Sequence, residues 1–123
     1  MSTKAELQAL LERVKAATGP NYALEIDIHA LFARAVDTPD RRAPAYTASL
    51  DAITALIERE LPGRGYGVLP AFDAWGGWIF RTMSPARFGG GHDIGKGGPT
   101  PALALTAAFL SALIAQMEVE HAA

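Results

Sequence analysis

Residues 100–117 read TPALALTAAFLSALIAQM, and this segment decides the predicted fold. Thr100 is a typical helix N-cap, and Pro101 suits the first helical position because its missing N–H would have no intrahelical partner there. The residues that follow are apolar on nearly every side of a helix, so that helix must be buried around most of its circumference. We therefore predict a C-terminal core helix that lies across a sheet.

Three helices are predicted before this segment. The first ends at Gly19-Pro20, the second has Asn21 as its N-cap, and the third runs from residue 45 or 47 to residue 61. Pro62-Gly63 ends the third helix, which has the clearest amphipathic pattern. The apolar stripes of the three helices consist of Leu7, Leu10, Leu11, Val14, Leu24, Ile28, Leu31, Tyr46, Leu50, Ile53, Ile57 and Leu61.

After the third helix the pattern becomes β-like. Apolar residues indicate one strand over residues 66–72 and a second over residues 78–82, with residues 73–77 as the turn between them. Pro70 favours an edge position for the first strand, because proline cannot donate a hydrogen bond to a neighbouring strand.

Residues 84–101 (SPARFGGGHDIGKGGPTP) are rich in glycine and are predicted to be mostly loop, with a short third strand near Arg87 and Phe88. Together these elements predict an α+β fold. It consists of N-terminal helices, a third amphipathic helix, an antiparallel hairpin or three-stranded sheet, and the C-terminal core helix packed on the sheet.

Length and composition favour one globular domain over residues 1–123. The chain has 50% hydrophobic and 20% charged residues, a balance that allows a buried core without disorder. Its formal net charge of -2 provides no positive field for a polyanion, which argues against generic nucleic-acid binding. The absence of cysteine excludes disulfides, thiolate metal sites and cysteine nucleophiles.

The sequence also bears on location. The first residues carry charges every few positions and lack the apolar core of a signal peptide, so export is not expected. The longest apolar stretch, residues 102–115, is shorter than the roughly 20 residues that a membrane-spanning helix needs. We therefore expect a cytoplasmic protein that makes no membrane contact.

The glycine-rich segment contains an incomplete nucleotide-binding motif. Residues 90–96 (GGHDIGK) follow the G-x4-G-K pattern of a P-loop, but Gly97 stands where a serine or threonine would bind magnesium. Pro99 and Pro101 delay the helix that a P-loop lysine normally opens. Nucleotide hydrolysis is therefore not expected.

A glycine-rich loop that leads into a helix is nevertheless a candidate anion site, because free backbone N–H groups and the helix dipole attract negative charge. Basic side chains nearby would add positive charge, and Trp75, Trp78, Phe88 or Tyr66 would stack on a base. The alternative interpretation is a surface loop with solvated charges. The predicted ligand site comprises Arg81, Arg87, Phe88, Gly91, His92, Lys96, Gly97 and Thr100.

The sequence offers no positive evidence for catalysis, a metal or a cofactor. His29 lies at helical spacing from Glu25, where a single histidine is typically structural. A metal site built from Asp27, His29 and residues 92–93 would need contacts that the spacing does not guarantee. The serines lack the G-x-S-x-G turn of a nucleophile. We therefore predict a protein that is not an enzyme and has no cofactor.

Three blocks of the sequence resemble small prophage-encoded proteins of the phage ABA-sandwich type. The blocks are residues 19–29 (GPNYALEIDIH), 46–63 (YTASLDAITALIERELPG) and 100–116 (TPALALTAAFLSALIAQ). In that family a helix with an acidic pair precedes a Tyr/Ser-Leu-Asp-Ala helix, a hairpin follows, and a Thr-Pro-Ala-Leu-Ala helix closes the domain. This chain departs from the pattern in residues 92–99 and in Trp75 and Trp78.

The resemblance implies a temperate-phage accessory protein, in a family for which no reaction is assigned. We expect it to counteract host bacterial defence by sequestering a phosphate-bearing, nucleotide-type signalling molecule, an expectation motivated by the glycine-rich segment. The alternatives are a protein-binding inhibitor of a host defence nuclease or effector, and a structural or regulatory phage protein. A homo-oligomer is compatible with each of these functions.

Overall fold

The computed structural model describes residues 4–32, 44–71, 74–79 and 94–122. These residues form four helices and a three-stranded antiparallel sheet, which confirms the predicted α+β fold. In chain order the elements are α1 (Lys4–Ala16), α2 (Tyr22–Phe32), α3 (Leu50–Glu60), β1 (Tyr66–Ala71), β2 (Ala74–Ile79), β3 (Ile94–Gly98) and α4 (Pro101–Ala122).

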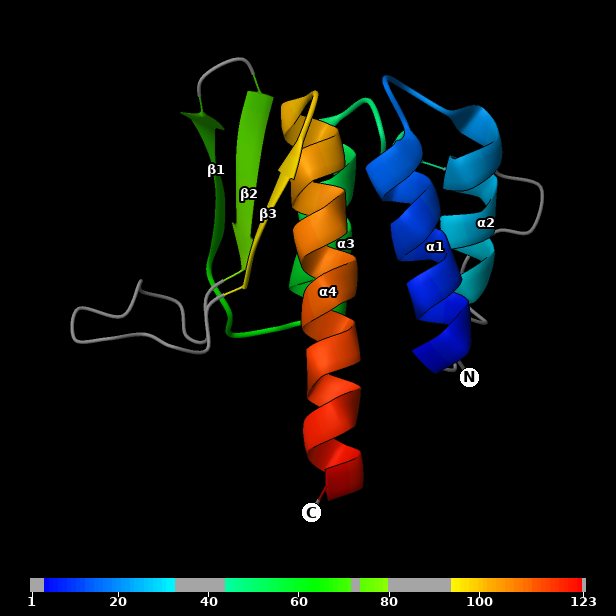
Figure 1. The fold of residues 1–123 in the computed structure, drawn as a ribbon, viewed down its shortest axis with the longest axis vertical. Coiled ribbons are helices and arrows are strands. Elements are labelled where there is room, and N and C mark those ends of the chain that lie inside the picture. The colour runs from blue at the N-terminus through cyan, green and yellow to red at the C-terminus, as the bar shows by residue number, and fades with distance from the viewer. Residues whose placement is uncertain (1–3, 33–43, 72–73, 80–93, 123) are drawn as a thin grey trace.

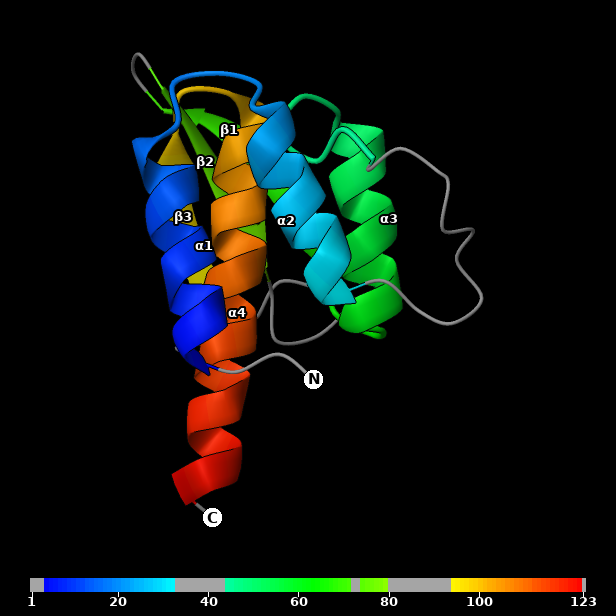
Figure 2. The same ribbon diagram turned by 90° about the vertical axis from the view of Figure 1, so that its right-hand side faces the viewer.

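The four helices lie on one side of the sheet (Figure 1). α4 packs directly on all three strands and separates them from α1, while α3 also packs against α4. α2 packs on α1, away from the sheet, and the C-terminal part of α4 extends beyond the other elements (Figures 1 and 2). α4 is therefore the central layer, as the sequence predicts.

The core lies where α4 meets the sheet and the other helices. Most of the predicted helix stripes are buried there. The prediction is wrong for Leu50, which is the first residue of α3 and is 36% exposed. The largest fully buried side chains are Leu7, Val14, Leu24, Ile28, Thr47, Ile53, Ile57, Ile79, Leu103, Leu105, Phe109 and Leu110.

α4 has no solvent-facing side over its first half, because every residue from 102 to 112 is buried. Thr106 is accommodated there because its hydroxyl is within hydrogen-bond distance of the Ala102 carbonyl (2.7 Å) and the Tyr46 carbonyl (3.1 Å). Within the described part of the chain, the Ser111 hydroxyl is buried and has no hydrogen-bond partner. Among the described helices, α4 included, none is long and apolar enough to cross a membrane.

The sheet has the order β1-β2-β3, so β1 is an edge strand and tolerates Pro70, as predicted. The predicted turn at residues 73–77 is wrong, because β2 already begins at Ala74, which pairs with Ala71 of β1. Glycines at positions 76 and 77 suggest a turn when only neighbouring residues are considered. In the fold they are strand residues opposite Leu69 and Val68.

A strand forms within the segment that is predicted to be mostly loop. β3 spans Ile94–Gly98, within the segment assigned to loop, while Arg87 and Phe88 lie outside the described residues. β3 pairs with β2 from Ile79↔Ile94 to Trp75↔Gly98. Its glycines have little strand propensity of their own, so the pairing with β2 and the packing on α4 place this segment in the sheet.

Two glycines allow α4 to lie directly on the strand backbone. A Cβ atom on Gly77 would lie 2.5 Å from the carbonyl carbon and oxygen of Ala104, and one on Gly98 would lie 2.9 Å from the Ala104 nitrogen. Carbon and backbone atoms cannot approach so closely without displacement. Gly77 and Gly98 therefore set the distance between the helix and the sheet.

α3 also begins later than predicted. Residues 46–48 form a turn, and Ser49 is the N-cap, with its hydroxyl accepting a hydrogen bond from the Ala52 N–H at 3.3 Å. The backbone N–H and hydroxyl of Thr47 both bind the Glu25 carboxylate, which holds this residue in the turn. Tyr46 is buried, as predicted, but it belongs to this turn and not to the helix.

Gly77→Ala should destabilise the protein by about 2–3 kcal/mol or more, because the added methyl group forces α4 away from the sheet. Urea unfolding followed by circular dichroism measures the change. Gly67→Ala is the matched control, since nothing lies within 4 Å of a Cβ atom at that position. Equal effects of the two substitutions would contradict the assigned role of Gly77.

Ser111→Ala should stabilise the protein by about 1 kcal/mol, because it removes a buried hydroxyl that lacks a partner and introduces a better helix former. The midpoint of urea unfolding should rise with an unchanged slope. Thr106→Ala is the control and should destabilise, because the Thr106 hydroxyl is hydrogen-bonded. A loss of stability in Ser111→Ala would show that the hydroxyl is satisfied in solution.

Candidate functional site

The predicted anion site falls largely outside the described residues. Five of its members lie outside the described residues: Arg81, Arg87, Phe88, Gly91 and His92. The structure therefore neither assembles nor separates the site. Lys96 and Gly97 belong to β3, where they pair with Gly77 and Gly76 of β2. These two residues are part of a strand rather than of a loop that wraps around a ligand.

Thr100 caps α4, as predicted, and thereby accepts hydrogen bonds from backbone N–H groups that an anion would need. Its hydroxyl accepts a hydrogen bond from the Leu103 N–H at 3.2 Å, and its carbonyl accepts one from the Ala104 N–H at 2.9 Å. Pro101 has no N–H, and Ala102 is only 3% exposed. The start of α4 is therefore closed by its own residues, and the anion site stays a prediction that depends on other residues.

Glu25, which the sequence places beside His29, is part of a buried polar cluster between α2 and the turn before α3. Its Oε2 atom accepts hydrogen bonds from the Thr47 hydroxyl at 2.6 Å and from the Thr47 N–H at 3.1 Å. The Thr47 hydroxyl in turn accepts one from the Asn21 N–H at 2.8 Å, and the Asn21 side chain caps α2 by accepting from the Leu24 N–H at 3.0 Å. This arrangement satisfies buried polar groups and gives Glu25 a structural role.

Asp27, the second acidic residue of α2, faces outward. Its carboxylate forms an ion pair with Arg13 of α1, and both side chains are about half exposed. A pair of this kind orients the two helices and adds little stability, because water screens it. The acidic pair that the family resemblance points to consists of Glu25 and Asp27. Glu25 makes a buried contact, whereas Asp27 makes a surface contact.

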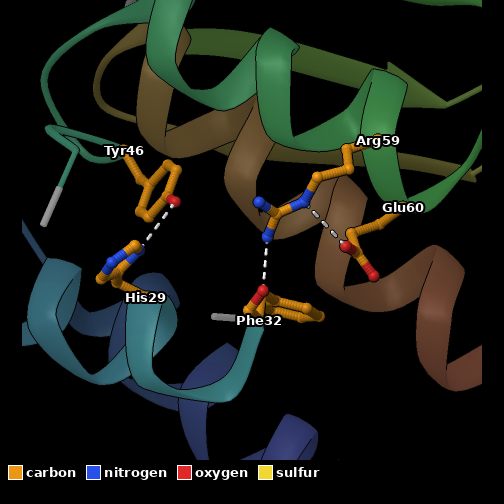
Figure 3. A network of polar contacts seen from close by, with 5 residues as sticks. All are labelled: His29, Phe32, Tyr46, Arg59 and Glu60. Atoms are coloured by element: carbon orange, nitrogen blue, oxygen red, sulfur yellow. Dashed lines mark hydrogen bonds and ion pairs between the residues drawn. The ribbon is translucent and has the colours of Figure 1, made fainter. Parts of the chain in front are cut away.

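His29 and Tyr46 lie side by side between α2 and the following turn (Figure 3). The His29 Nδ1 atom is 3.4 Å from the Tyr46 hydroxyl, and the ring centroids are 6.5 Å apart. Among the described residues, no group of three histidine, aspartate or glutamate side chains is placed to hold a metal ion. The predicted structural role of His29 fits this contact, while residues 92–93 lie outside the described range.

Arg59 completes the polar contacts of Figure 3. Its guanidinium donates to the carbonyl of Phe32, at the C-terminal end of α2, and its Nε atom is 3.1 Å from Glu60 Oε2. A cation at the C-terminus of a helix compensates the unpaired carbonyls and the helix dipole. Arg59 therefore joins α3 to α2.

Tyr66, a predicted stacking residue, begins β1 and contacts α3 through its hydroxyl. Its hydroxyl donates a hydrogen bond to Glu58 Oε2 at 2.5 Å. This hydrogen bond raises the pKa of the Tyr66 hydroxyl, and partial burial and the negative charge of Glu58 add to the effect, while Thr54 opposes it. The contact holds the edge strand to the helix layer.

The residues that point away from α4 define the open face of the sheet. Strand alternation and register assign them, starting from Gly77 and Gly98, which face Ala104. None of these positions carries a charged residue, and none of the described helices covers them (Figure 1). The open face consists of Gly67, Leu69, Ala74, Gly76, Trp78, Gly95 and Gly97.

Leu69 and Trp78 protrude from the open face. Leu69 is 61% exposed and Trp78 is 38% exposed, although both are large apolar side chains. Leu69 lies opposite Gly76 and Trp78 opposite Gly67, so the two side chains are diagonal neighbours on adjacent strands. Sequence reasoning identified Trp78 as a stacking residue but missed Leu69, which the alternation of β1 around Pro70 would have indicated.

Glycines surround these two side chains without being required by the fold. A Cβ atom would meet nothing within 4 Å at Gly67, and would make only ordinary contacts of 3.5 Å at Gly76 and 3.6 Å at Gly97. None of the three has a positive φ angle. Glycine weakens a strand relative to other residues, and inside strands it often marks a place where another molecule approaches the backbone.

Tyr66→Phe should cost about 0.5–1 kcal/mol of stability at neutral pH, because it removes one hydrogen bond. Since the folded-state pKa of Tyr66 is raised, this contribution is present below the unfolded value of 10.0 and is lost as the pH rises through the folded pKa. The difference between wild type and variant, measured by urea unfolding at stepped alkaline pH, should therefore shrink. A Glu58→Gln background should remove this pH dependence, and its persistence there would contradict the assignment.

Known proteins provide no identity for this chain. No protein-family model, curated protein or solved structure matches it. The resemblance to phage ABA-sandwich proteins therefore stays a prediction, and the function has to be argued from the geometry of the site.

Proposed function

We propose that this chain is a non-enzymatic binding protein that contacts another protein through the open face of its sheet. The observation that carries the proposal is the adjacent pair Leu69 and Trp78, exposed on a face without charged residues. Tryptophan is enriched among the residues that dominate binding energy at protein interfaces, and charged residues are depleted at interface centres.

Three charged residues of the described helices make contacts that hold the fold together. Glu25 is held by Thr47, Asp27 by Arg13, and Arg59 by Phe32 and Glu60. Each of these contacts joins two elements of the fold or two neighbouring residues. The exposed apolar side chains on the open face have no comparable role within the described chain.

The chemistry of the face favours a protein over a nucleotide. Phosphate needs cations or free N–H groups, and the open face has no charged position. Nucleotide sequestration stays the competing prediction, supported here by the exposed ring of Trp78, on which a base would stack. With the phage resemblance, the partner class that we propose is a host defence nuclease or effector.

Site-specific photo-cross-linking in bacterial cells tests this proposal. A photoreactive phenylalanine analogue at position 69 should form a discrete adduct with a protein, and Trp78→Ser in the same chain should abolish it. The analogue at position 26 is the control, because Ile26 is a comparably exposed apolar residue on α2, with 43% of its surface accessible. Mass spectrometry of the adduct identifies the partner.

Three outcomes decide between the alternatives. An adduct specific to position 69 and dependent on Trp78 supports protein binding through the open face. Equal labelling from positions 26 and 69, or none from either, would overturn it. Calorimetric heat with cyclic dinucleotides or other nucleotides, lost in Lys96→Ala, would instead favour sequestration.

A further inference from the structure

We draw no further inference here: the strongest candidate, the exposed apolar side chains of Tyr22 and Ile26 one turn apart on α2, carries nothing because no feature of the described residues shows what covers that face of the helix.

Discussion

The contact between the strand backbone and α4 is the constraint on which the rest of the structure depends. Gly77 and Gly98 place their α-carbons against the backbone of Ala104, so at these two positions helix and sheet meet with no side chain between them. Because α4 is covered by the sheet on one side and by α1 and α3 on others, its first half is buried all round. α4 is therefore the common core element of the sheet on one side and of the helices on the other.

The polar contacts have a different role, because they join the helices to one another and to the turn before α3 at defined positions. Glu25 and Thr47 fix the turn before α3, Arg59 binds the end of α2, and Arg13 pairs with Asp27 between α1 and α2. Buried hydrogen bonds are directional, so they specify a relative orientation as well as adding stability. The charged and polar residues of these contacts therefore connect the helices and the turn before α3.

The close packing on one face of the sheet has a consequence for the other. All described helices lie on the α4 side, so the apolar Leu69 and Trp78 remain on the surface of a three-stranded sheet. A face of this composition is costly to leave in water and is suited to contact with protein. The exposure of this face follows from the same asymmetry that builds the core.

The sequence by itself determined the features that depend on neighbouring residues: the three helices before the sheet, the caps at Asn21 and Thr100, and the edge position of Pro70. Only the tertiary structure decided where α3 begins, that β3 lies at Ile94–Gly98, and which way Trp78 faces. Contacts such as Glu25 with Thr47 and Gly77 with Ala104 join residues far apart in the chain, and no local pattern encodes them. Propensity and capping act over a few residues, whereas packing selects among the conformations that they allow.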